Sequence, residues 1–360
     1  MQIKNDYISR IIFFTNHYFG WRNWAVLVYN SIFENIFVLF YIALRNETSS
    51  IYFIIHFFFF LLFSSFCTTY GYLINDLGDK ELDKIHGKDN TFKNDSGRKA
   101  CFIVLFFLLL SFISCLPFIE NAFFLSLWLS WLFICTAYSL KPFRLKEKGK
   151  IGLLLVVIAQ RVLPALLMFS AFRHYNWIDI AIITSYIFFR GLSSDVNHQL
   201  EDYNNDSTTE TDTYAVQTGI RKTKKIFRFS LEMEKALLFF CLLEMYFELP
   251  YLKIYDFPLI LPLLLLYIMI YGLNLYTIFS HGKSIDVNPF IPDRKNIFQF
   301  IHHTFPTVLL SLYLLFLLIY IEWLFIILLL FFIIVRKFYS LEIILNSLPA
   351  MIIRNRFTKG

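Results

Sequence analysis

The stretch that decides the fold covers residues 51–83 and reads IYFIIHFFFFLLFSSFCTTYGYLI followed by NDLGDKELD. Its first part, residues 51–74, is an apolar run that exceeds the roughly 20 residues an α-helix needs to cross a bilayer core. Its second part places Asn75, Asp79 and Asp83 four residues apart. If the helix continues past the apolar run, these side chains share one face. The stretch therefore predicts a membrane-spanning helix with a carboxylate-rich face at one end.

The whole chain has the composition of a membrane protein. Of its 360 residues 57% are hydrophobic and 17% are charged, and its mean hydropathy is +0.57. Lipid offers no partner to free backbone groups, so the long apolar runs must be helices. We predict an all-α bundle of about nine transmembrane helices, or ten if residues 323–335 form a further span. The expected spans are 24–44, 51–74, 100–119, 121–140, 151–172, 177–194, 233–252, 257–279 and 297–320.

This pattern divides the chain into three regions. Residues 1–23 form an N-terminal segment on the cytosolic side, residues 24–320 form the transmembrane domain, and residues 321–360 add an apolar segment and a basic tail. The apolar segment 323–335 could extend the ninth helix, form a tenth short span or lie partly in the interface.

Basic residues gather in three loops, at 75–99, 141–150 and 195–232. These loops follow the second, fourth and sixth expected spans, so they lie on one side of the membrane, and an excess of Lys and Arg marks that side as the cytosol. The net charge of +6 is thereby explained by membrane orientation rather than by nucleic-acid binding. We expect a multi-pass protein of the plasma membrane whose polar chemistry faces the cytosol.

The carboxylates form two clusters on that side. The first is the face of Asn75, Asp79 and Asp83; in the second, Asp195, His198, Asp202 and Asp206 follow one another at offsets of 0, 3, 7 and 11 along one expected helical face. Like charges four residues apart destabilise a helix, so such faces are expected where a cation compensates them. Mg²⁺ binds through one or two carboxylates, water and phosphate oxygens. Two facing clusters could therefore each hold one Mg²⁺ on a diphosphate and stabilise its departure.

A third polar element follows the fourth span and contains Arg144 and Lys146. Any cytosolic loop accumulates Lys and Arg, which is one explanation of this element. The other is that Arg144 and Lys146 donate hydrogen bonds to the diphosphate, with Arg144 suited to bidentate contact.

These three motifs resemble the UbiA superfamily of intramembrane prenyltransferases. Its signature Asn-Asp-x-x-Asp-x-x-x-Asp is matched by Asn75, Asp76, Asp79 and Asp83. Its second signature, Asp-x-x-x-Asp followed by a Thr and a Gly, resembles Asp202, Asp206, Thr213 and Gly219. The run Tyr-Ser-x-x-Pro-x-Arg-Leu-Lys of several members is matched by residues 138–146. The resemblance covers roughly residues 20–320.

The resemblance implies a nine-helix bundle whose central cavity is capped by the motif loops on the cytosolic side. It also implies Mg²⁺-dependent transfer of an isoprenyl chain from its diphosphate to an aromatic or other lipophilic acceptor, in the bilayer, with no protein partner. The site residues it implies fall into three sets: catalytic Asn75, Asp76, Asp79, Asp83, Asp202 and Asp206; diphosphate-binding Arg144, Lys146, Tyr138, His198 and Lys88; and metal-binding Asp79, Asp83, Asp202 and Asp206.

Two departures from the family pattern concern the acceptor. Many members have His-Pro and then Arg-Pro after the first motif, whereas here Gly87 follows His86 and no Arg-Pro pair occurs before Phe92. The pair His198 and Gln199 precedes the second motif, and several quinone-forming members lack this pair. The donor chemistry is unaffected.

Two other functions compete with prenyl transfer. One is phosphoribosyl transfer to a polyprenyl phosphate, which stays inside the same superfamily. The other is ion-coupled transport, because intramembrane acids often mark ion pathways. The carboxylate clusters lie at the ends of the spans rather than at the midplane, which disfavours a transporter.

The basic loops generate a prediction about topology. Reporters fused near Lys93, Lys148 and Lys222 should all indicate the cytosol, because each position lies in a loop rich in Lys and Arg. Alkaline phosphatase fusions, active only outside the cytosol, measure this directly. An active fusion at any of the three positions would refute the orientation.

Overall fold

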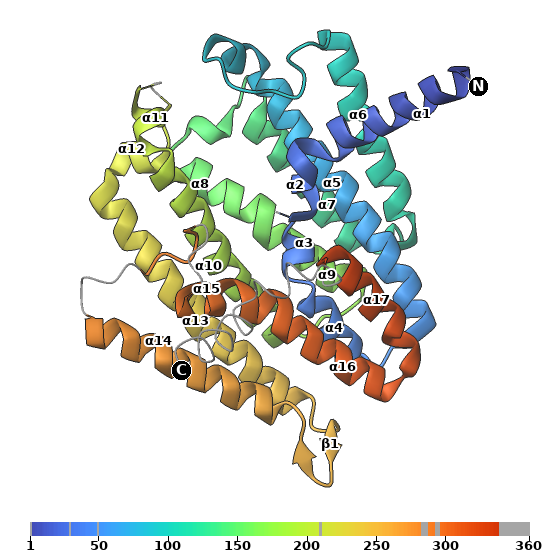
Figure 1. Ribbon diagram of the computed structural model, residues 1–360, viewed down its shortest axis with the longest axis vertical. Helices are drawn as coiled ribbons and strands as arrows, with labels where there is room; N and C mark the ends of the chain where they lie inside the picture. Colours follow the sequence, from blue (N-terminus) through green and yellow to red (C-terminus); the bar gives the residue numbers. More distant parts are fainter. Residues whose placement is uncertain are drawn as a thin grey trace, which may run out of the picture. The chain divides into compact units, whose positions relative to one another are not determined.

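The computed structural model describes residues 2–28, 30–48, 50–208, 211–281, 287–291 and 296–337, and most of them are helical (Figure 1). A short antiparallel pair joins β1 (Lys253–Ile254) to β2 (Phe257–Pro258). The predicted all-α architecture is confirmed. The chain divides into two compact units, one formed by Met1–Asn35 and Ile55–Glu232, the other by Ile36–Ile54 and Met233–Gly360.

The first unit holds all three sequence motifs. Its elements are α1 (Gln2–Phe14), the π-helix η1 (Thr15–Phe19), α2 (Trp21–Val28), α3 (Ser31–Glu34), most of α5 (Ser50–Ile85), α6 (Gly97–Cys115), η2 (Leu116–Phe118), α7 (Ala122–Ser139), η3 (Leu145–Glu147), α8 (Lys150–Val157), the π-helix η4 (Ile158–Val162), α9 (Leu163–Ala171), α10 (Trp177–Glu201), α11 (Tyr203–Thr208), α12 (Tyr214–Thr218) and the start of α13 (Ile220–Glu248).

Capping residues set where these helices begin. The side chains of Asn121 and Asn176 each accept two backbone N–H groups at the starts of α7 and α10, and Ser96 accepts the N–H of Lys99 in the first turn of α6. Each cap satisfies a donor that has no partner within the helix. At the other end α7 stops at Ser139, shortly before Pro142, which has no N–H to continue a helix.

Helix α5 is the longest element and carries the first motif. It runs from Ser50 to Ile85 over 36 residues, which at about 1.5 Å per residue is longer than the roughly 30 Å core of a bilayer. The helix therefore continues past its apolar part. The predicted shared face of Asn75, Asp79 and Asp83 follows from this continuation.

Helix α6 has one apolar face that the protein does not cover. Ala100, Ile103 and Phe107 are buried, whereas the side chains of Phe102 and Leu105 are 70% and 60% exposed. An exposed apolar stripe on a helix of this length is typical of a surface in contact with lipid.

The second unit contains α4 (Phe37–Arg45), the first turn of α5, the rest of α13, the strand pair, α14 (Leu261–His281), α15 (Ile297–Gln299), the π-helix η6 (Phe300–Leu310), α16 (Ser311–Ile321), η7 (Trp323–Phe325) and α17 (Ile326–Val335). Buried polar contacts connect its helices: His302 on η6 pairs with Glu234 on α13, and the Lys235 ammonium donates to Asn274 on α14 at 3.1 Å.

Helices occupy all nine expected spans. Within the residues that the structure describes, six helices are long and apolar enough to cross a membrane: Ser50–Ile85, Gly97–Phe118, Ala122–Ser139, Lys150–Ala171, Leu261–Ser280 and Ile297–Ile321. The three expected spans that fall short have identifiable causes. The first is broken into α2, α3 and α4 around the cap Asn30, whereas α10 and α13 contain charged residues such as Arg190 and Glu234. The chain is an integral multi-pass membrane protein.

Residues 323–335 do not extend the ninth helix. Glu322 leaves the helical conformation, with φ −146° and ψ 115°, and thereby ends α16. Its carboxylate binds the side chain of Ser50 and accepts the backbone N–H of Ser50 at 3.3 Å. A separate apolar helix, Trp323–Val335, follows and is short for a membrane span. The basic tail after residue 337 lies outside the described residues.

Candidate active site at the ends of three helices

The first motif lies where α5 packs against the end of α7. A Cβ atom at Gly78 would lie 2.5 Å from the carbonyl oxygen of Ser139, so only glycine permits this approach. The close contact brings Asp79 next to the loop that follows α7. The glycine inside the first motif thus joins the first and third motifs.

Asp79 is the centre of the resulting cluster. The Lys146 ammonium lies 2.5 Å from both carboxylate oxygens of Asp79 and 3.1 Å from Oδ1 of Asn75. The Arg144 guanidinium donates to Asp79 Oδ1 at 2.9 Å and to the carbonyl of Gly78 at 3.1 Å. Two cations from one loop therefore neutralise the central carboxylate of the first motif. Arg144 and Lys146 are thus in direct contact with the first motif.

The pKa values of these two cations shift in opposite directions. Burial lowers the pKa of the Lys146 ammonium by more than the charge of Asp79 raises it. Burial also lowers the pKa of Arg144, but its hydrogen bonds and the charges of Glu147 and Asp79 outweigh this and raise it overall. The anions beside the two side chains therefore favour their charged forms, and burial outweighs this effect at Lys146 but not at Arg144.

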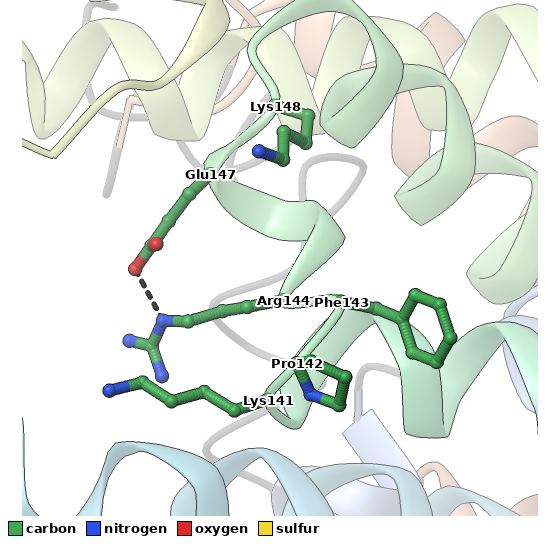
Figure 2. Close-up of a pocket in the computed structure, with 6 residues that line it drawn as sticks. All are labelled: Lys141, Pro142, Phe143, Arg144, Glu147 and Lys148. Carbon is green, nitrogen blue, oxygen red and sulfur yellow. Dashed lines mark hydrogen bonds and ion pairs between the residues drawn. The ribbon is translucent and has the colours of Figure 1, made fainter.

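A cavity of about 360 Å³ lies on the other side of Arg144, lined by Lys141, Pro142, Phe143, Arg144, Glu147 and Lys148. In Figure 2 the guanidinium of Arg144 meets the carboxylate of Glu147. The side chain of Lys141 extends toward the same side, and Phe143 points away. Arg144 thus joins this cavity to Asp79.

Asp76 is held away from this cluster. Its side chain is 1% exposed and accepts hydrogen bonds from Trp21 Nε1 at 3.0 Å, from Arg22 at 3.3 Å and from the Thr91 hydroxyl at 2.6 Å. A carboxylate so enclosed positions the backbone around it. These contacts hold Asp76 apart from Asp79, and the catalytic role expected of Asp76 from the motif stays a prediction.

Asp83 faces the loop after α5. Its Oδ2 accepts the side-chain amide of Asn90 at 2.8 Å, and the same amide donates to the backbone carbonyl of Asp76. The backbone N–H of Lys88 donates to the carbonyl of Asp83 at 2.8 Å. The loop therefore turns back onto the first motif and brings Lys88 to this end of the helix.

The second cluster is distributed over two helices. α10 ends at Glu201 with Asp202 as its C-cap, and Asp206 lies on the short helix α11. The expectation of one continuous helical face from Asp195 to Asp206 is therefore wrong, because the chain bends at Asp202. His198 Nε2 lies 3.4 Å from Asp202 Oδ2, and both side chains are exposed.

Asp206 is the buried member of this cluster, at 9% exposure. Burial and, next, the charge of Asp202 raise its pKa, against the charges of Lys88 and His198, which lower it. The cation of Lys88, from the loop after the first motif, is thus near enough to act on the second motif. The two motifs approach each other at Lys88.

Tyr138 is near a member of each cluster, because the charges of Asp79 in the first and of Asp195 in the second act on its hydroxyl. Asp195 has a buried Oδ2 without a hydrogen-bond partner among the described residues, and the buried hydroxyl of Thr213 lies beside the second motif, where its hydrogen bond lowers the pKa of Asp206.

The donor set suits Mg²⁺ in its chemistry. The candidate ligands are carboxylates, an amide oxygen and the buried oxygens of Asp195 and Thr213, all hard oxygen donors of the kind Mg²⁺ prefers. Within the ranges that the structure describes, no three His, Cys, Asp or Glu side chains converge on one point. Mg²⁺ typically takes only one or two protein carboxylates and completes its shell with water and phosphate oxygens, so carboxylates in pairs fit it.

A buried ion-pair cluster was not identified from the sequence. Glu34 on α3 binds Arg161 on η4 through one carboxylate oxygen and Arg190 on α10 through the other, the latter at 2.8 Å. Arg190 also donates to Asn35 at 3.0 Å, and a Cβ at Gly191 would lie 2.2 Å from Cγ of Arg161. The signal was available, because each charge interrupts an expected apolar span, and such residues are functional candidates.

The geometry of three motifs on one unit can be compared with known proteins. The model of the UbiA prenyltransferase family matches residues 35–284. The chain belongs to the UbiA prenyltransferase family. The family predicted from the motifs is confirmed, and the enzyme class predicted for the chain, a UbiA-type prenyltransferase, is that of the family.

A curated UbiA-type relative is the digeranylgeranylglyceryl phosphate synthase of Sulfurisphaera tokodaii. It is 31% identical over 160 residues, 42% of this chain and 54% of the relative. The chain thus spans about half the length of the relative it matches.

Solved UbiA structures share the fold. A UbiA homologue from Archaeoglobus fulgidus bound to DMAPP and Mg²⁺ matches 80% of this chain and 98% of its own, with a TM-score of 0.52 and 19% identity. The same homologue bound to GPP and Mg²⁺ matches with a TM-score of 0.51, 18% identity and the same coverage.

The buried ion-pair cluster generates a prediction about stability. Glu34→Gln keeps the size of the side chain but leaves Arg161 and Arg190 without their shared anion. Removing one partner of a buried pair typically costs about 3–5 kcal/mol, so the thermal midpoint in detergent should fall by several degrees. The control is Glu81→Gln on the exposed side of α5, which should leave it unchanged. Equal midpoints for both variants would show that the cluster does not stabilise the fold.

Proposed function

We propose that this UbiA-family protein transfers a prenyl group from an isoprenyl diphosphate to a lipophilic acceptor within the membrane, with Mg²⁺ as the cofactor. The observation that carries the proposal is the cluster of Asn75 and Asp79 with Arg144 and Lys146. It joins carboxylates for a metal and cations for an anion at the polar ends of apolar helices. A donor with a diphosphate head and an apolar chain needs this combination.

The diphosphate would bind to Arg144 and Lys146. A guanidinium can contact two phosphate oxygens at once, and an ammonium acts as a compact point charge. The anion would also favour the charged form of Lys146, whose pKa burial lowers. Lys88, Tyr138 and His198 would complete the proposed contacts of the head group.

Magnesium would be held by Asp79 and Asp83 on one side and by Asp202 and Asp206 on the other, and would neutralise charge on the departing diphosphate. Support comes from the name of the Archaeoglobus fulgidus structure, which was solved with DMAPP and Mg²⁺. Arg144 and Lys146 act on the same charge. As the bond to the first carbon of the prenyl chain breaks, its electron pair leaves with the diphosphate, and both cations stabilise that charge more strongly than they stabilise the intact donor.

The polar end of the acceptor would bind at the buried ion-pair cluster. Among the described residues, Arg161 has an Nε without a hydrogen-bond partner, and Asp195, on which the charge of Arg161 acts, has a buried Oδ2 without one. An anionic or hydroxyl-bearing head fits these groups. The Sulfurisphaera tokodaii relative is named for a lipid phosphate product, which supports an acceptor of that class. As the acceptor oxygen bonds to the prenyl carbon, its proton would pass to Asp195.

The orientation and membrane remain part of the proposal. The motif-bearing loops are those rich in Lys and Arg, so the diphosphate would enter from the cytosol, and we place the protein in the plasma membrane. A central apolar cavity for the prenyl chain is expected from the family resemblance.

Phosphoribosyl transfer to a polyprenyl phosphate is the second candidate, because the same carboxylates and cations would bind phosphoribosyl diphosphate. Purified protein in lipid nanodiscs should distinguish the two. Incubated with Mg²⁺ and a lipid extract, it should release diphosphate from geranyl diphosphate and form a heavier lipid detectable by mass spectrometry. Consumption of phosphoribosyl diphosphate instead would assign the protein to phosphoribosyl transfer. Turnover of neither substrate, with a proton or sodium flux, would favour a transporter.

The diphosphate contacts generate a prediction about turnover. Lys146→Met removes a charge that stabilises the leaving group. The activation free energy should therefore rise by an amount on the order of 1–4 kcal/mol, with the corresponding fall in kcat, and donor binding should weaken. Lys150→Met changes an exposed lysine at the start of α8 and serves as the control with wild-type kcat. Steady-state kinetics with geranyl diphosphate measures both. An unchanged kcat in Lys146→Met would remove Lys146 from the mechanism.

The two carboxylate clusters generate a prediction about coupling. Asp83→Asn and Asp206→Asn should each reduce turnover far more than they reduce the amount of protein in the membrane, because each removes a proposed metal-binding charge. The double variant should be little worse than either single one, since residues that act as one unit are not additive. Multiplicative losses would show that the two clusters act independently, and wild-type turnover of Asp206→Asn at saturating Mg²⁺ would exclude it as a ligand.

A further inference from the structure

The N-terminal segment is not used by the proposed mechanism. Helical periodicity places Tyr7, Ile8 and Ile11 of α1 on one face, with Ser9 opposite. The described part of the chain leaves this apolar face uncovered, because the side chains of Tyr7, Ile8 and Ile11 are 67%, 50% and 64% exposed. Figure 1 shows α1 extending from α2 past α6 toward the N-terminus.

The helix emerges beside a surface that faces lipid. At its last residue the Phe14 ring lies 5.9 Å from the ring of Phe106 and 6.1 Å from that of Phe107, both on α6. The neighbouring side chains Phe102 and Leu105 form the exposed apolar stripe of α6. The uncovered face of α1 is therefore continuous with a lipid-facing surface of the same unit.

Charge complements this placement. α1 carries Lys4 and Arg10, against the single acid Asp6. The loop before α6 adds Lys93, and the first turn of α6 adds Arg98 and Lys99. A helix with one apolar face and basic residues binds in the plane of an anionic lipid surface.

The next residues connect this helix to the first motif. Tyr18 donates to Asp95 at 2.7 Å, and His17 Nε2 donates to the carbonyl of Thr91 at 3.0 Å, so η1 holds the loop at 86–96. Lys99 also pairs with Asp95 at 2.6 Å. Trp21 then donates to Asp76 and stacks on Tyr72 with ring centres 4.1 Å apart.

We propose that α1 lies in the lipid surface of the membrane and that residues 15–22, here called the strap, transmit this anchoring to the loop at 86–96 and to Asp76. The strap therefore positions the backbone of the first motif and the nearby Lys88. The effect of the strap on donor binding rests on the proposed function, whereas the contact of α1 with lipid does not.

The lipid contact can be measured without any turnover. In the full chain, with Cys101→Ser and Cys135→Ser to remove the more accessible thiols, a spin label is placed at Ile11→Cys and, as the matched control, at Ser9→Cys. In nanodiscs containing phosphatidylglycerol, the label at position 11 should collide more with oxygen than with a water-soluble nickel chelate, and the label at position 9 should show the reverse. Equal exposure of both to the nickel chelate would overturn the proposal. Shielding of position 11 from both reagents would also overturn it, because a protein partner would then cover the face.

The strap is tested by Tyr18→Phe combined with Trp21→Phe, which removes two donors to carboxylates and keeps an aromatic ring at each position. Amide hydrogen exchange in residues 86–96 should rise by roughly tenfold or more, the factor expected for losing hydrogen bonds to charged groups, and the KM for geranyl diphosphate should rise while kcat changes less. The control Tyr7→Phe on α1 should alter neither. Unchanged exchange would refute the strap, whereas faster exchange in a protein that turns over no prenyl donor would refute only the proposed function.

Discussion

The neutralisation of Asp79 by Arg144 and Lys146 is the interaction on which the rest of the site depends. The partners lie 65 and 67 residues apart in the sequence, and a carboxylate at this depth would be costly without them. Their meeting requires α5 to continue past its apolar part, Gly78 to admit the backbone of Ser139, and α7 to end before Pro142. Each feature depends on residues that can be identified in the sequence. Together the three features join two motifs that no local sequence pattern connects.

The sequence was informative where periodicity and motif spacing carry physical meaning. Apolar runs predicted helices in all nine spans, and the four-residue spacing of Asn75, Asp79 and Asp83 predicted a shared face because α5 is regular throughout. The spacing from Asp195 to Asp206 failed because a helix ends at Asp202, and a face cannot be extended across a bend. Asp76 matched its motif by identity, yet its partners Trp21 and Arg22 come from a segment whose contacts are set by tertiary packing.

The buried charges also show that sequence patterns do not predict contacts set by tertiary packing. Glu34, Arg161 and Arg190 stand out as charged residues inside apolar runs, but their pairing depends on how three helices pack. Once paired, they supply both a stable polar centre and, in the proposed function, a place for the polar end of an acceptor. Polar groups thus occur at two positions along the helices of the first unit: the motif residues at the helix ends and the ion-pair cluster further inside. The reaction proposed for this UbiA-family protein needs both, since its donor has a charged head and its acceptor is lipophilic.

The central claim is that the carboxylates and the two cations together bind a prenyl diphosphate through Mg²⁺. Calorimetric titration of the protein in nanodiscs with geranyl S-thiolodiphosphate, a donor analogue whose carbon–sulfur bond resists cleavage, tests this without an acceptor. Our account predicts saturable binding in the presence of Mg²⁺ that weakens by at least about tenfold, or 1.4 kcal/mol, when the metal is removed with a chelator. Equal affinity with and without Mg²⁺, or displacement of the analogue by a lower concentration of phosphoribosyl diphosphate, would contradict it.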